Sequence, residues 1–191
     1  PVSKIFLEKK KIIKKIKKKY FFYPANFWEH KNHFNLIKGF KIFLKNNKNY
    51  NLILSGAKKN NYSSVISLIK QLNISNKIKI EGHVSLNKLI SLYDNCFGVI
   101  YASFSGPENL PPMEALARKK ILLNSIYPGA KEQLKNFPIY FNPKSPNEIA
   151  KAMTKSLMKK SFIENKKIDK YLKLKYSKLY IKNLIKKLID V

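Results

Sequence analysis

Hydrophobic and polar positions follow two patterns that alternate along the chain from residue 20 onward. Unbroken apolar runs are typical of strands buried on both faces, and apolar residues three or four positions apart are typical of helices. Such runs predict strands at 20–23, 51–54, 78–80, 97–101, 120–124 and 139–141. Helical spacing predicts helices at 30–46, 61–73, 85–93, from 111, near 130–135 and 145–158. Ser85 is the expected N-cap of one helix, and Ser145 with Glu148 forms a capping box for another.

This order of elements predicts the fold class. Strands that alternate with helices form parallel sheets with right-handed crossovers. We therefore expect an α/β fold, a Rossmann-like doubly wound parallel sheet of about six strands with helices at the C-terminus. Ligands of such sheets bind outside the carboxyl ends of the strands. The loops expected to meet there are 24–31, 55–61, 81–85, 102–110 and 124–130.

Composition divides the chain into three segments. Residues 1–19 contain a lysine-rich run and are interpreted as a basic linker at the end of a preceding domain, with contact to an anionic membrane as the functional alternative. Residues 20–160 hold the alternating strand and helix pattern. Residues 161–191 predict one or two long basic helices.

The charge of the chain points first to nucleic acid. The 191 residues carry a net charge of +28, from 39 basic and 11 acidic residues. Proteins that bind nucleic acid usually use arginine for its bidentate fork, yet Arg118 is the only arginine. Abundant lysine, asparagine and isoleucine together indicate a codon bias acting on exposed positions. A basic nucleic-acid-binding module therefore stays as an alternative, and the charge is expected to attract polyphosphate ligands in either case.

Several other classes are disfavoured. The single cysteine, Cys96, excludes a disulfide framework and is expected to be a buried core thiol. His30, His33 and His83 lack the partners of a metal site, and the first two are expected to order their loop or pack against Trp28. No apolar run approaches the roughly 20 residues that span a bilayer. We expect a cytoplasmic fragment of a longer protein.

The segment 105–117 carries the most specific chemistry. A loop leaves the predicted strand 97–101, turns at 106–107 and opens a helix whose first turn holds two prolines, where missing N–H groups cost nothing. A helix N-terminus offers free N–H groups and a positive dipole end to an anion. Glu114, about one turn in, can accept hydrogen bonds from a ribose diol. A nucleoside diphosphate would engage both features; a capped helix with a surface glutamate is the alternative.

Leu110-Pro111-Pro112-Met113-Glu114-Ala115 resembles the second half of the glutamate motif of retaining family 4 glycosyltransferases with the GT-B fold. Two glutamates lie eight positions apart in that motif. By this resemblance Glu114 corresponds to the second glutamate, which binds the nucleotide ribose, and Gly106 stands where the first contacts the donor sugar. The neighbours expected to line the same donor site are Ser105, Asn109 and Leu110.

Other loops match the same family. Lys31 resembles the lysine that binds the donor diphosphate, and Asn26 lies where the family often has an arginine. Gly56 resembles a small-residue turn at which the backbone would approach the ligand closely. His83 and Val84 resemble the segment that holds the nucleotide base. Each of these matches alone is also compatible with a surface lysine or an ordinary turn.

The resemblance implies the donor-binding, C-terminal half of a GT-B enzyme. Lys31 and Glu114 would be the catalytic residues, with a nucleotide-diphosphate sugar as donor and neither a metal nor another cofactor. The acceptor would bind a separate N-terminal domain, in surface polysaccharide or lipopolysaccharide assembly at the inner face of the membrane. A GT-B nucleotide-sugar epimerase is a further alternative, because Gly106 replaces the first glutamate of the motif.

Overall fold

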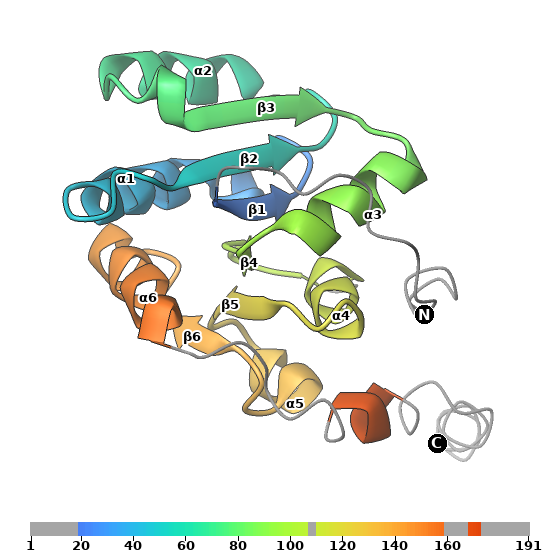
Figure 1. Ribbon diagram of the computed structural model, residues 1–191. Coiled ribbons are helices and arrows are strands. Elements are labelled where there is room, and N and C mark those ends of the chain that lie inside the picture. Colours follow the sequence, from blue (N-terminus) through green and yellow to red (C-terminus); the bar gives the residue numbers. More distant parts are fainter. Residues whose placement is uncertain (1–18, 107–109, 159–167, 173–191) are drawn as a thin grey trace.

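The structure is a computed structural model that describes residues 19–106, 110–158 and 168–172. Its six strands pair in parallel in the order β3-β2-β1-β4-β5-β6, which Figure 1 shows from top to bottom. The strands are β1 (Tyr20–Pro24), β2 (Asn51–Ser55), β3 (Ile78–Gly82), β4 (Gly98–Tyr101), β5 (Ile121–Ser125) and β6 (Ile139–Phe141). The helices are η2 (Glu29–Lys31), α1 (His33–Leu44), α2 (Tyr62–Gln71), η3 (Ser75–Lys77), α3 (Leu86–Asn95), α4 (Leu110–Ala117), α5 (Ala130–Leu134) and α6 (Pro146–Met158). The doubly wound fold predicted from the sequence is confirmed.

Each face of the sheet is covered by its own hydrophobic core. Successive strand side chains point to opposite faces, so β1 sends Phe21 to the core under α1, α2 and α6 and Phe22 to the core under α3, α4 and α5. Both phenylalanines are fully buried. Residues 168–172 are helical and add two buried side chains to the second core. The rest of the predicted C-terminal helices and nearly all of the predicted linker at 1–19 lie outside the described residues.

Asn32 interrupts the first predicted helix. Its backbone is left-handed, with φ 58°, so the short helix η2 ends before α1 begins. Asparagine tolerates this conformation better than most residues. Its buried side chain donates hydrogen bonds from Nδ2 to the carbonyls of Ala102 (3.0 Å) and Pro143 (2.7 Å). Asn32 therefore joins the loop after β1 to the loops after β4 and β6.

Both helix caps expected from the sequence are present, and one of them differs from the expected hydrogen-bond pattern. Ser85 Oγ accepts a hydrogen bond from the backbone N–H of Lys88, as an N-cap should. Ser145 Oγ accepts from the N–H of Glu148, but the Glu148 carboxylate accepts from the N–H of Asn142 rather than of Ser145. The second half of the box thus reaches into the turn after β6.

The only arginine of the chain locks α4 against α3. Arg118 lies just beyond α4, and its guanidinium donates two hydrogen bonds to the carboxylate of Asp94, one of them from Nε at 2.6 Å. Lys120 Nζ donates to the carbonyls of Asp94 (2.6 Å) and Cys96 (3.3 Å). A planar fork suits the two oxygens of one carboxylate. These contacts fix the helix that carries Glu114.

We predict that Arg118→Lys lowers the free energy of unfolding by about 2 kcal/mol, because lysine keeps the charge but loses the bidentate fork. Denaturant unfolding followed by circular dichroism measures this change. Lys119→Met is the matched control, since it breaks the more exposed pair with Asp169 and should cost less than about 1 kcal/mol. Equal losses in the two variants would contradict a specific role for the fork.

Candidate functional site

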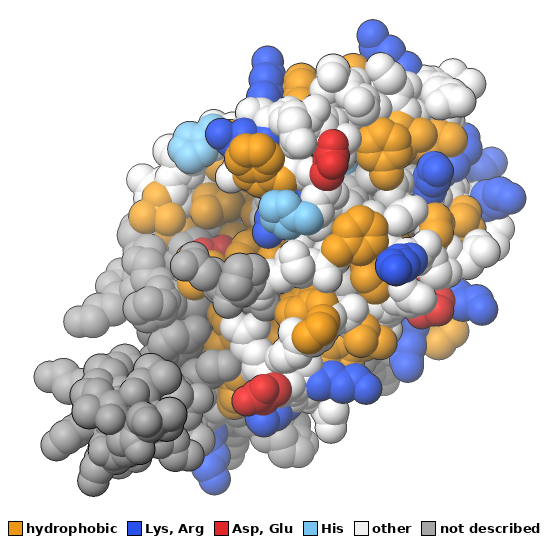
Figure 2. Space-filling model, turned by 180° about the vertical axis from the view of Figure 1, so that it is seen from behind, with side chains coloured by type: hydrophobic (Ala, Val, Ile, Leu, Met, Phe, Trp, Pro, Cys, Tyr) orange, Lys and Arg blue, Asp and Glu red, His pale blue; other side chains and the backbone are white. Residues whose placement is uncertain are grey.

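A cavity of about 780 Å³ opens at the carboxyl ends of the strands. Figure 2 shows this face hollowed, with histidine side chains at the border of the hollow and hydrophobic atoms at its floor. The lining residues come from the ends of β1, β2 and β4, from the loops after β1, β2, β3 and β4, from α3 and from α4: Pro24, Ala25, Asn26, His30, Lys31, Ser55, Gly56, His83, Val84, Leu89, Tyr101, Gly106, Leu110, Pro111 and Glu114. Its size suits a small-molecule ligand, and its place is the one expected for a doubly wound sheet.

Glu114 supplies a carboxylate to this cavity from α4. Its Oε2 accepts a hydrogen bond from the hydroxyl of Tyr93 at 2.7 Å. Burial raises the pKa of Glu114 above its ordinary value, and the hydrogen bond from Tyr93 opposes that rise. The carboxylate is thus poorly hydrated but held by a donor, which leaves capacity to accept hydrogen bonds from a ligand.

Lys31 supplies the ammonium group. Its Nζ donates to the hydroxyl of Tyr101 at 3.3 Å and lies 5.6 Å from the centroid of the same ring. Its backbone carbonyl accepts a hydrogen bond from the hydroxyl of Tyr23 at 2.5 Å. Burial lowers the pKa of Lys31, because a half-buried ammonium is less well hydrated than a free one. Two tyrosines therefore hold this lysine at the cavity wall.

Gly56 lines the cavity, and the structure gives a further reason for its glycine. A Cβ at this position would lie 2.2 Å from the carbonyl oxygen of Ala25, so the loop after β1 excludes a side chain. The N–H of Gly56 donates to the carbonyl of Gly82 at 2.9 Å. Asn26 Oδ1 accepts from the N–H of Ala57 at 2.8 Å, which joins the same two loops. Gly56 and Asn26 shape the cavity by holding its loops together.

The loop after β4 is attached to η2 through backbone carbonyls. Ser103 Oγ hydrogen bonds the carbonyls of His30 (3.1 Å) and Ser105, and the N–H of Phe104 donates to the same His30 carbonyl at 2.9 Å. Ser125 Oγ donates to the carbonyl of Ser103 at 2.6 Å. The expectation that His30 orders its loop therefore holds through its backbone.

His33 corrects the second expectation for the histidines. It is fully buried and stacks on Phe27, with ring centroids 4.5 Å apart, rather than on Trp28. Burial lowers the pKa of His33 to about 3, so the ring is neutral at physiological pH. Lys59 lies over Trp28 instead, 5.0 Å from the ring centroid. His33 is thus a core residue beneath the site.

The described part of the chain contains neither a cluster of metal ligands nor a membrane-spanning helix. No group of three or more histidine, cysteine, aspartate or glutamate side chains there could hold a metal ion. The same residues include no helix with the length and apolar character needed to cross a bilayer. The expectation that the site works without a metal stays a prediction.

Comparison with known sequences decides the family. The family model described as Glycosyl transferases group 1 matches residues 5–175. The chain belongs to the group 1 glycosyltransferases. It is 31% identical to the O-antigen chain mannosyltransferase RfbU of Salmonella typhimurium over an alignment of 132 residues. This alignment covers 69% of this chain and 36% of RfbU. The resemblance drawn from the motif around Glu114 is confirmed at the level of the family.

Solved structures of glycosyltransferases show the same fold. HepE of Anabaena, in complex with UDP and glucose, aligns with a TM-score of 0.77 at 15% identity, over 91% of this chain and 48% of HepE. The C-terminal domain of LpcC, a group 1 glycosyltransferase from Francisella tularensis, aligns with a TM-score of 0.66 at 20% identity, over 74% of this chain and 77% of that domain. The chain spans less than half the length of RfbU and HepE.

The structure brings most of the predicted site residues of this glycosyltransferase chain to one cavity: Asn26, Lys31, Gly56, His83, Val84, Gly106, Leu110 and Glu114. Ser105 is not among the lining residues, and its carbonyl instead accepts the hydrogen bond from Ser103. Asn109 lies outside the described residues. The contacts that each would make with a donor stay predictions.

Two tyrosines of the site were missed. Tyr101 and Tyr93 lie on β4 and α3, where an aromatic residue among apolar neighbours is typical of a core. Tyr101 lines the cavity with its hydroxyl beside Lys31, and the hydroxyl of Tyr93 connects that residue to the site through Glu114. The sequence offered one signal for them, which is a tyrosine at a position expected to be buried. A buried hydroxyl needs a hydrogen-bond partner, whereas phenylalanine would need none.

We predict that Gly56→Ala lowers the free energy of unfolding by about 3 kcal/mol, because the new Cβ overlaps a backbone carbonyl that cannot rotate away. Denaturant unfolding measures the loss. Gly82→Ala is the control: it strains a left-handed backbone but meets no atom within 4 Å, and should cost about 1 kcal/mol. A loss for Gly56→Ala no larger than for the control would argue against the close crossing of the two loops.

Proposed function

We propose that this chain binds the nucleotide-diphosphate sugar donor of a retaining glycosyltransferase. The observation that carries the proposal is a carboxylate, Glu114, and an ammonium group, Lys31, on the walls of one cavity at the carboxyl ends of the sheet. Family membership supports the reaction class, and the UDP in the related HepE structure supports the ligand class.

Each part of such a donor has a chemically suitable partner. The carboxylate of Glu114 accepts hydrogen bonds from ribose hydroxyls, which act as donors. The Lys31 ammonium and the N-terminal turn of α4 attract the diphosphate. His83 and Val84, in the loop after β3, lie at the wall where the base would bind through backbone groups. Gly106 at the cavity wall has no side chain, so the sugar end of the site has room.

Sugar transfer breaks the bond between the anomeric carbon and the diphosphate and forms a bond to an acceptor oxygen. Negative charge builds up on the departing diphosphate as its bond breaks. The half-buried Lys31 stabilises this charge more strongly than a fully hydrated lysine would, because it is already oriented by Tyr101. Lys31 is therefore the residue with the largest expected effect on the chemical step.

The proposal also includes a class of acceptor for the transferred sugar. RfbU is an O-antigen chain mannosyltransferase, and this supports a lipopolysaccharide-type acceptor for the protein of which this chain is a part. We propose that a further N-terminal domain binds that acceptor, since the relatives are more than twice as long as the matched region. The basic segment 1–19 would then favour contact with the anionic inner face of the membrane.

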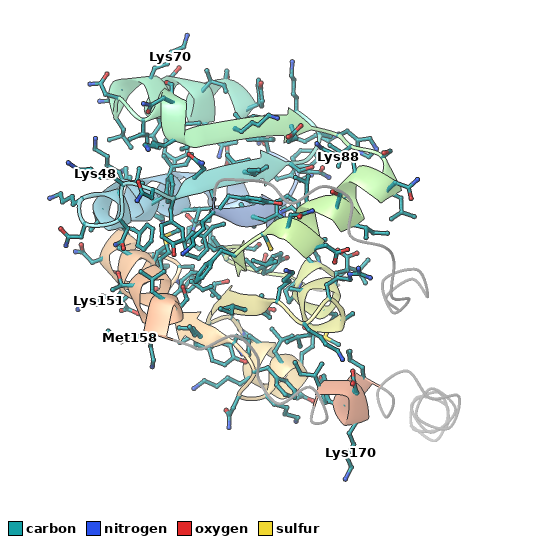
Figure 3. All side chains as sticks on the ribbon, viewed as in Figure 1. Lys48, Lys70, Lys88, Lys151, Met158 and Lys170 are labelled. Carbon is teal, nitrogen blue, oxygen red and sulfur yellow. The ribbon has the colours of Figure 1, made fainter. Side chains whose placement is uncertain are left out.

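Among the described residues, the lysines labelled in Figure 3 are spread over the molecule and form no single basic face. Lys48, Lys70, Lys88, Lys151 and Lys170 project outward from separate parts of the molecule (Figure 3). A nucleic-acid interface usually gathers its basic residues on one face or along one helix. The charge is better explained as a general attraction for anionic ligands and surfaces.

Glu114→Gln should weaken the binding of the nucleoside diphosphate about tenfold or more, because a neutral amide replaces a charged hydrogen-bond acceptor. Isothermal titration with UDP, GDP and ADP, each at low and high salt, identifies the preferred nucleotide and measures the loss. Glu132→Gln on the exposed side of α5 is the matched control and should leave affinity unchanged.

Two results would contradict the donor site. Equal affinities in wild type and Glu114→Gln would remove the ribose role of Glu114. Binding of a short oligonucleotide alone, abolished by salt and unaffected by Glu114→Gln, would favour the nucleic-acid module instead.

Nucleotide binding should weaken at both low and high pH, with Glu114 setting the acid limit and Lys31 the basic limit. Burial raises the pKa of Glu114 above 4.5, so its carboxylate is lost as the pH falls through that raised pKa. Burial lowers the pKa of Lys31 below 10.5, so its charge is lost as the pH rises through that lowered pKa. Titrations across this range should give a bell-shaped affinity profile.

Variants assign the two limits of the profile. Glu114→Gln should remove the contribution of the carboxylate to the acid limit, while ionisation of the ligand phosphate persists in both proteins. Lys31→Met should flatten the basic limit. A wild-type profile without a basic limit would mean that the Lys31 charge does not contact the diphosphate.

A further inference from the structure

Tyr93 lies behind the cavity wall, and its hydroxyl reaches the Glu114 carboxylate. It comes from α3, its side chain is fully buried, and its ring packs edge-on against Phe22 with centroids 5.1 Å apart. It is absent from the residues that line the cavity. Its hydroxyl, however, crosses to α4, where Glu114 begins the second turn.

The hydroxyl has one proton to donate, and two acceptors on α4 lie near it. Glu114 Oε2 lies 2.7 Å away and the carbonyl of Pro111 lies 3.4 Å away, so the carboxylate takes the proton. One carboxylate oxygen is thereby held, and the other oxygen keeps its full capacity to accept. Tyr93 thus restricts the rotation of the Glu114 side chain without occupying the cavity.

Packing alone does not account for the hydroxyl. Phenylalanine would fill the same core position beside Phe22 and would bury no polar atom. A buried hydroxyl costs free energy unless it is hydrogen bonded, and the partner that this one has is the carboxylate at the cavity. The hydrogen bond to Glu114 is therefore a reason for tyrosine rather than phenylalanine at this position.

We propose that Tyr93 is a positioning residue for nucleotide binding, which holds the Glu114 carboxylate oriented toward the ribose. This inference rests on the donor-binding function proposed above. Tyr93 acts through Glu114 and does not touch the ligand. The hydrogen bond also keeps the pKa of Glu114 from rising as far as burial alone would raise it.

Other titratable groups among the described residues also face the cavity or α3. Lys31 and His83 line the same cavity from the loops after β1 and β3. On the α3 side, Asp94 is paired with Arg118. Neither partner of that pair is removed when Tyr93 is replaced, so a change at Tyr93 reports on its own hydrogen bond.

Tyr93→Phe tests the proposal, with UDP, GDP and ADP and their 2′-deoxy forms as probes. The variant should bind the preferred ribonucleotide about fivefold more weakly, as expected for one hydrogen bond. It should lose part of the preference for the ribonucleotide over its 2′-deoxy form. The acid limit of binding should move to higher pH, because the Glu114 carboxyl loses the donor that favours its ionised form. In a Glu114→Gln background the same substitution should have little further effect.

Tyr20→Phe is the matched control. Tyr20 is buried in the same core, and its hydroxyl donates to the carbonyl of Leu92 at 2.8 Å, with no hydrogen bond to Glu114. The Tyr20→Phe substitution removes a comparable buried hydroxyl, and it should leave the ribose preference and the acid limit of binding unchanged. If Tyr93→Phe does not fold, site-specific 3-fluorotyrosine at position 93 keeps the ring and the hydroxyl. Its more acidic phenol should move the acid limit to lower pH.

The outcomes separate the two proposals. If wild type binds a nucleoside diphosphate and Glu114→Gln loses it, but Tyr93→Phe behaves as Tyr20→Phe does, the positioning role is wrong and the donor site stands. Equal weakening of ribonucleotide and 2′-deoxy forms, with no shift of the acid limit, would indicate a purely structural tyrosine and would also overturn it. If wild type binds no nucleoside diphosphate, both proposals fail.

Discussion

Burial of the central strand β1 on both faces is the constraint on which the rest of the structure depends. Phe21 and Phe22 enter opposite cores, and β1 pairs on both edges with parallel strands. A strand enclosed in this way can offer polar groups to solvent only at its ends. Parallel pairing then places the carboxyl ends of neighbouring strands together, so the loops that leave them share one cavity.

The loops do not rely on a ligand to hold them there. Asn32 reaches the carbonyls of two other loops, and Ser103 joins the loop after β4 to η2. Gly56 allows the loops after β1 and β2 to touch backbone to backbone. The loops that carry and flank Lys31 are thus positioned by hydrogen bonds that also satisfy buried polar groups, while Glu114 is held by Tyr93 and its helix by the Arg118–Asp94 pair.

Sequence alone predicted the order of strands and helices because both faces of the sheet are buried and the apolar runs are unbroken. The resemblance of two local motifs to those of a known family also pointed to Glu114 and Lys31, and both line the cavity. Sequence alone could not predict the break at Asn32, whose partners lie 70 and 111 residues away, or the reason for Gly56, which is set by Ala25. The link between Tyr93 and Glu114 was hidden for the same reason, because it crosses between two helices.

Two departures from the family motif leave fewer charged side chains to bind a ligand in the site. Gly106 stands in place of a glutamate, and Ala25 and Asn26 occupy the stretch where the family often has an arginine. Among the described residues that line the cavity, Lys31 and Glu114 are then the lysine and the carboxylate that remain. Both are partly desolvated, so each charge acts more strongly on a bound ligand than it would in water. The many surface lysines can raise the local concentration of any polyphosphate, but they cannot distinguish one from another. With the proposed donor-binding function, selectivity for a ribonucleotide would come from the partly buried Glu114 carboxylate and from the hydrogen bond that holds it in place.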